Sequence, residues 1–83
     1  IHGKQSMQLV DELRGMVDVY CYLKQWSEAL SAHIEAKAIM EANGRTATEE
    51  YGELLRLIGE LEEIQGRHEQ AMEWYRKSET VLS

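Results

Sequence analysis

The side chains best suited to chemistry are scattered along this sequence rather than grouped. His2, His33 and His68 lie far apart, and no His-x3-His or Glu-x2-His pair faces one way on a helix. A zinc-type site needs three or four such ligands converging on one point. His33 is therefore interpreted as a packing residue, and the sequence predicts neither a metal site nor a cofactor.

Nucleophiles are equally isolated. Cys21 is the single cysteine and has no CxxC partner, while Ser27 and Ser31 have no partnered base. The glutamates between residues 60 and 63 form a charge run, which is typical of a solvated helix surface. No pattern supports a reaction, so we expect a protein that is not an enzyme.

Composition and charge narrow the classes of partner. The chain has 83 residues and a formal net charge of −6. Nucleic acids and anionic membrane surfaces both attract a basic face, so neither is an expected partner. No apolar run approaches the roughly 20 residues of a membrane-spanning helix. A lone cysteine forms no internal disulfide, so a reducing compartment and a cytoplasmic location are expected.

The elements that must position any functional residue are predicted to be four helices. Apolar residues repeat at spacings of three and four in each segment, which is the period of one helix face. The predicted helices span residues 6–23, 26–42, 47–65 and 68–82. The breaks within each pair are short enough to make antiparallel neighbours. We therefore predict an all-α fold of two stacked antiparallel helical hairpins.

Two local signals mark the middle of the chain. Asn43 and Gly44 both tolerate the left-handed conformation that ends helices. Thr46 followed by Glu49 has the spacing of a capping box, which predicts that the third helix begins directly after Thr46. The predicted division is a tail at 1–5, a hairpin at 6–42, a loop at 43–46 and a hairpin at 47–83.

The two hairpins resemble each other when they are superposed. An offset of 42 residues brings Ala29 onto Ala71. The same offset pairs Leu13 with Leu55, Arg14 with Arg56, Met16 with Ile58 and His33 with Tyr75. A fixed period of this length is typical of stacked repeats.

The second unit resembles a tetratricopeptide repeat. It has Leu55-x2-Ile58-Gly59, a turn glycine at Gly66, and Ala71-x3-Tyr75. The first unit is similar but departs from the pattern, with Val17 at the small-residue site, Lys24 for the turn glycine and His33 for the aromatic residue. The second unit departs at Glu62 and Ser78, and the closing proline is missing from both. The long spacing is similar to that of kinesin light chain repeats.

The resemblance implies a protein-interaction module whose ligands lie on the first helix of each hairpin. Helical spacing independently places these sites on one stripe, opposite the apolar face. The predicted partner-binding residues are Asp11, Arg14, Asp18, Tyr22, Glu53, Arg56, Glu60 and Glu63.

This predicted face is mainly acidic, and two interpretations of it are open. We hypothesise that it holds a basic or mixed-charge peptide or helix of a partner protein. Alternatively, its charges form a solvated surface of pairs such as Asp11–Arg14 and Arg56–Glu60, and such pairs contribute little. Lysine and asparagine, which hold acidic chaperone tails in other family members, are missing from these positions.

Two repeats are fewer than the three that usually make a stable stack. The chain begins at Ile1 rather than methionine, so we expect a fragment of a larger protein, with possible self-association through exposed repeat ends. The alternative functions are a structural oligomerisation element and a trafficking module of the microtubule-interacting-and-transport type.

Overall fold

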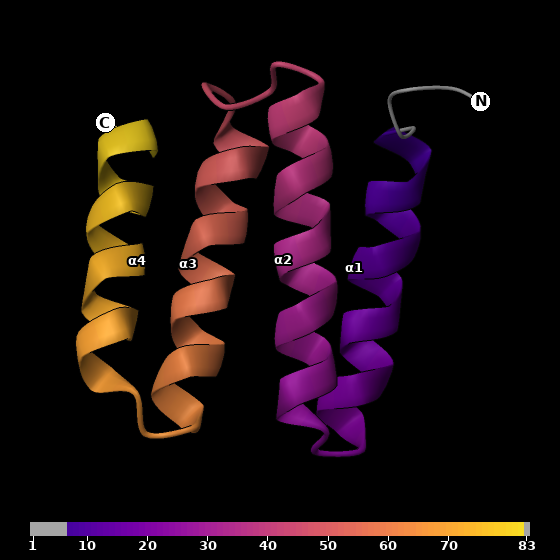
Figure 1. The fold of residues 1–83 in the computed structure, drawn as a ribbon, viewed down its shortest axis with the longest axis vertical. Helices are drawn as coiled ribbons and strands as arrows, with labels where there is room; N and C mark the ends of the chain where they lie inside the picture. Colours follow the sequence, from indigo (N-terminus) through magenta and orange to yellow (C-terminus); the bar gives the residue numbers. More distant parts are fainter. Residues whose placement is uncertain (1–6, 83) are drawn as a thin grey trace.

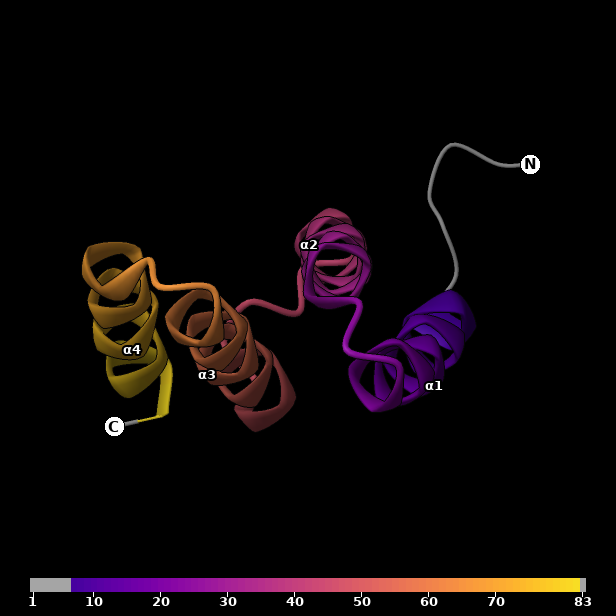
Figure 2. The ribbon, with the colours of Figure 1, turned by 90° about the horizontal axis from the view of Figure 1, so that it is seen from below.

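The computed structural model describes residues 7–82, which form four α-helices: α1 (Met7–Tyr22), α2 (Trp26–Ala42), α3 (Glu49–Ile64) and α4 (His68–Leu82). The helices stand side by side in chain order and alternate in direction (Figure 1). Among these four helices, the close backbone contacts join α1 to α2, α2 to α3 and α3 to α4. Seen from below, α1 and α3 lie on one side of α2 (Figure 2). The predicted all-α fold of two stacked antiparallel hairpins is confirmed.

Each of the first three helices ends in the same backbone conformation. Lys24, Gly44 and Gly66 follow their helices with φ of 59°, 71° and 86°. This left-handed conformation lets the chain reverse while its amides satisfy the last carbonyls of the helix. Glycine adopts it without a steric cost, whereas lysine does not.

The turns within the two hairpins make the same hydrogen bonds. In both turns, the amide of the left-handed residue donates to the carbonyl three residues earlier at 3.0 Å. The next amide donates five residues back, at 2.8 Å in the first turn and 2.9 Å in the second. The four bonds are Lys24 to Cys21, Gln25 to Tyr20, Gly66 to Glu63 and Arg67 to Glu62. The repeat therefore extends to backbone geometry, although only one turn has the glycine.

The predicted capping residue of the third helix is wrong. Thr48, not Thr46, is the N-cap, and its hydroxyl oxygen accepts the amide of Tyr51 at 3.1 Å. The same hydroxyl donates to the carbonyl of Arg45 at 3.0 Å. Tertiary packing selects this start, since it buries Tyr51 and lets its hydroxyl donate to Glu41 of α2 at 2.8 Å. The predicted tail at 1–5 lies outside the described residues.

The core runs continuously across the first three helices. It contains the largest fully buried side chains, which are Met40, Leu54, Leu55, Ile58 and Val10. At the helix crossings, Ala29 is 0% exposed and Ala71 is 1% exposed, as equivalent small residues should be. Both crossings are therefore tight, and the two hairpins bring α1 and α3 to the same face.

Candidate functional site: the cleft between the first and third helices

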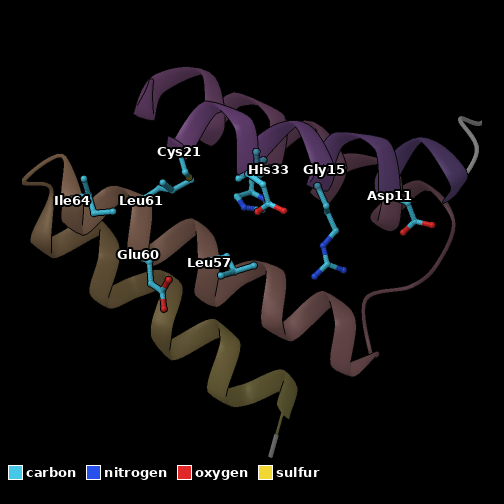
Figure 3. A pocket seen from close by; sticks show the side chains of 11 residues that line it. Asp11, Gly15, Cys21, His33, Leu57, Glu60, Leu61 and Ile64 are labelled. Carbon is cyan, nitrogen blue, oxygen red and sulfur yellow. The ribbon is translucent and has the colours of Figure 1, made fainter. Parts of the chain in front are cut away.

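A cleft of about 500 Å³ opens between α1 and α3. Its lining includes four of the predicted binding residues, Asp11, Arg14, Asp18 and Glu60. His33 of α2 reaches the middle of the cleft, with Cys21 and Ile64 toward one end and Asp11 at the other (Figure 3). The stacking of the two hairpins therefore creates one concave site from three helices.

The lining is divided between apolar and acidic surface. Val17, Leu57, Leu61 and Ile64 supply the apolar part. Leu61 is buried at 4% exposure, whereas Ile64 is 54% exposed. Three carboxylates and one guanidinium supply the charge, so the lining carries a net negative charge. The cleft therefore presents apolar surface beside negative charge.

The ion pairs on this face leave two aspartates available. Arg14 Nη1 lies 3.0 Å from Glu50 Oε2, which ties α1 to α3. The predicted Asp11–Arg14 pair is not among the ion pairs of the described residues. Neither Asp11 nor Asp18 makes a hydrogen bond or ion pair with another described residue, and both are exposed. Their negative charge is therefore not neutralised by a neighbouring side chain.

The second arginine of the repeat is held along its own helix. Arg56 Nη1 lies 2.5 Å from Glu60 Oε2, as the solvated-surface interpretation predicted. Glu53 lies between the two arginines, 3.8 Å from Arg14 Nη2 and 3.6 Å from Arg56 Nη2. These ion pairs orient the charged side chains along α3 and contribute little to stability.

His33 is the buried polar group of the cleft. It is 3% exposed, and its Nδ1 atom has no hydrogen-bond partner among the described residues. Burial, together with the positive charge of Arg14, lowers the pKa of His33 to about 4, and Asp18 opposes this shift. The imidazole is therefore neutral at pH 7, with one nitrogen that carries a proton and one that accepts a hydrogen bond.

Cys21 is poorly suited to act as a nucleophile. Burial and the negative charge of Asp18 both raise the pKa of its thiol above the ordinary value. The thiolate is the reactive form, so this environment disfavours nucleophilic chemistry at the cleft.

The other predicted binding residues lie outside this cleft. Glu53 and Arg56 line a separate hollow of about 280 Å³, with Glu49, Glu50 and Leu82. Tyr22 is 86% exposed and lines neither hollow. Glu63 accepts a hydrogen bond from the Tyr75 hydroxyl at 2.7 Å. The eight predicted binding residues therefore do not share one surface, because the stacked hairpins place them in separate hollows or outside both.

Sequence reasoning placed His33 in the packing but not in the site. Its burial confirms the packing interpretation. Its place in the cleft could have been suspected from the repeat, since the equivalent residue is Tyr75, and a histidine there introduces polar atoms into an aromatic position.

Two further findings concern the described part of the chain. Across residues 7–82, no group of three or more histidine, cysteine or carboxylate side chains is arranged to hold a metal ion. None of the described helices has the length and apolar character needed to cross a membrane.

The comparison with known families agrees with the geometry. The tetratricopeptide repeat family matches residues 10–83. No curated protein and no solved structure gives a significant match. Because the family match covers both hairpins and the turns and crossings repeat in space, the chain belongs to the tetratricopeptide repeat family.

Proposed function

We propose that this chain is a non-catalytic protein-interaction module that binds a peptide or helix of a partner in the α1–α3 cleft. Repeats of this family generally mediate protein–protein interaction or scaffolding. The observation that carries the proposal is the concave cleft itself, which gathers Asp11, Asp18 and Glu60 on one surface. The same proposal includes a cytoplasmic location.

The charge of the cleft defines the partner. The two unpaired aspartates attract a basic or mixed-charge segment, and the low dielectric of a partly enclosed cleft strengthens that attraction. Arg14 also lines the cleft and its guanidinium is engaged by Glu50 and Glu53, so three carboxylates against one guanidinium keep the lining net negative. Tyr22, Arg56 and Glu63 flank the cleft on the same helices and form its rim in this proposal.

Selection from a random peptide library tests the proposal. We expect wild-type protein to enrich peptides that contain lysine or arginine. The double variant Asp18→Lys/Glu60→Lys should weaken their binding at least tenfold, about 1.4 kcal/mol or more. The control Glu73→Lys/Glu79→Lys makes the same change in net charge on α4, away from the cleft. Equal losses in both variants, or no loss in either, would remove the cleft from the function.

Self-association is a second candidate function, supported by one surface. Met16, Val19 and Leu23 are 43%, 56% and 54% exposed at or near the end of α1, although all three are large and apolar. Such a patch favours packing against another helix face. Sedimentation velocity over a range of concentrations tests this candidate, and a strict monomer at high concentration would argue against it. The three-helix trafficking module is not carried forward, since the described chain forms four helices.

A further inference from the structure

We propose that the cleft takes one cationic side chain of the partner, a lysine or arginine, whose charged head sits between Asp18 and Glu60 and donates a hydrogen bond to His33. This inference rests on the proposed function and specifies the chemistry of the same site. It makes His33 a specificity-determining residue.

An unpartnered nitrogen of His33 supports this contact. A buried polar atom without a hydrogen bond is unfavourable, and native proteins contain few of them. Among the buried side-chain nitrogen and oxygen atoms of the described residues, His33 Nδ1 is the one that has no hydrogen-bond partner. The atom belongs to a residue that lines the cleft, but the atom itself is covered. An occupant of the cleft can therefore satisfy it only after the imidazole ring turns.

The equivalent position in the second hairpin supports the same contact. There, Tyr75 takes the place of His33 and Glu63 takes the place of Cys21. Tyr75 and Glu63 bond to each other at 2.7 Å. In the first hairpin, His33 and Cys21 make no such bond. The second hairpin therefore satisfies its own polar group, whereas the first leaves its polar group for a ligand.

The neutral imidazole ring favours a hydrogen-bond donor as its partner. With its proton on Nε2, the imidazole presents Nδ1 as an acceptor, which needs a donor. Asp18, which has no partner among the described residues, favours a donor that carries positive charge. Glu60 adds a second carboxylate to the cleft, although it is also bonded to Arg56. Lysine and arginine are the side chains that provide both, and a hydrogen bond to a charged group is stronger than one between neutral groups.

The apolar part of the lining suits the methylene stem of such a side chain. Leu57 and Leu61 face the cleft from α3. The methylene stems of lysine and arginine pack on apolar surface while their heads reach polar groups. Because Nδ1 is covered, the proposal includes a turn of the imidazole ring about its Cβ–Cγ bond, which brings this atom to the cleft.

The experiment uses peptides selected on the wild-type protein. Each lysine or arginine is replaced singly by norleucine, which keeps the stem and removes the charge. We expect one position at which norleucine weakens binding at least tenfold. Exchange of lysine and arginine at that position identifies the preferred head. The absence of any such position would overturn the inference.

The matched variants are His33→Phe and Tyr75→Phe, which remove polar atoms from equivalent positions. His33→Phe should weaken binding of the cationic peptide about tenfold, as expected for a hydrogen bond to a charged group. It should leave the norleucine peptide unchanged. Tyr75→Phe should affect neither peptide. If His33→Phe keeps the full preference for the cationic peptide, the inference is wrong, while the Asp18→Lys/Glu60→Lys result still decides the proposed function.

A spectroscopic readout on the wild-type protein does not depend on the variants' folding. We expect the Nδ1 nitrogen resonance of His33 to shift when the cationic peptide saturates the protein, and to remain in place with the norleucine peptide. Binding of the cationic peptide without any change at the imidazole nitrogens would contradict the proposed contact. If no peptide binds in the cleft, both the inference and the proposed function fail.

Discussion

The two hairpins share a backbone but use it differently. Their turns have matching hydrogen bonds, and their crossings have buried alanines. At the aromatic position the second hairpin has Tyr75, which packs against Gly59 and bonds to Glu63. The first has His33, whose Nδ1 stays unpartnered. One repeat therefore satisfies its polar group within the packing, whereas the other leaves a buried nitrogen of a cleft-lining residue without a partner.

The second hairpin has a buried glutamate where the first has a tyrosine, and nearby side chains satisfy its charge. In the second, Glu62 is 9% exposed, and its carboxylate accepts from Arg67 and, at 3.2 Å, from Trp74 Nε1. The equivalent position in the first is Tyr20, a partly buried residue packed against the core. The second hairpin thus replaces an apolar contact by a satisfied polar network, whereas the first leaves the buried Nδ1 atom of His33 unsatisfied.

The largest effect is expected where the second hairpin is tightest. A Cβ atom at Gly59 would lie 2.8 Å from Tyr75 Cε1 and 3.2 Å from the Ala71 carbonyl oxygen. Gly59→Val, which copies Val17 of the first hairpin, should destabilise the protein by about 3 kcal/mol through overpacking. Urea unfolding measures this loss. A Cβ atom at Gly15 would have no neighbour within 4 Å, so the control Gly15→Ala should stabilise α1 by about 0.5–1 kcal/mol. A tolerated valine would show that the second crossing is loose.

The second effect is a pH dependence confined to the first hairpin. The pKa of His33 is about 4 in the folded protein, against an ordinary value of 6.5. Below that ordinary value the unfolded chain binds a proton that the folded chain refuses, so stability falls as the pH drops from 7 toward 4. This loss amounts to about 2–3 kcal/mol for a buried group.

Comparison with a variant isolates this contribution from the carboxylates, including Glu41, whose pKa is lowered by its bonds to Lys37 and Tyr51. We expect unfolding of His33→Phe to lack this component of the pH dependence. Tyr75 contributes nothing in this range, because burial and Glu63 raise its pKa to about 12. Direct titration of His33 by NMR checks the same point, and an ordinary pKa would show that the ring is solvated.

A smaller effect is expected at the turns. Lys24 and Gly66 have the same left-handed conformation, with φ of 59° and 86°. Lys24→Gly should stabilise the protein by about 0.5–1 kcal/mol, because the steric cost of the side chain exceeds the entropy that glycine loses. Gly66→Lys should destabilise it by a similar amount. Thermal unfolding measures both, and effects of the same sign would mean that the two turns are not equivalent.

Much of the fold could be predicted because periodicity and repetition are local signals. Helical spacing identified all four helices, and the 42-residue offset identified equivalent positions such as Ala29 and Ala71. The start of α3 could not be predicted from the capping pattern. Two threonines compete there, and the burial of Tyr51 against α2 selects Thr48 over Thr46.

The candidate site was only partly predictable, for a reason of geometry. Helical spacing correctly placed Asp11, Arg14 and Asp18 on one stripe, but it does not say which residues of a second helix face them. That depends on how the hairpins stack, which groups Glu60 with them and leaves Glu53 and Arg56 in another hollow. The role of His33 required knowledge of its missing hydrogen bond.

The smallest expected effect is the change in stability when the imidazole of His33 is removed. We compare the free energy of unfolding of His33→Phe with that of the wild type by urea denaturation at pH 7, using Tyr75→Phe as the reference. Because the imidazole has an unpartnered buried nitrogen, we predict that His33→Phe is as stable as the wild type or more stable. Tyr75→Phe should lose about 0.5–1 kcal/mol with its bond to Glu63. A loss of about 1 kcal/mol or more in His33→Phe would contradict the account, since it would show that the imidazole serves the fold rather than a ligand.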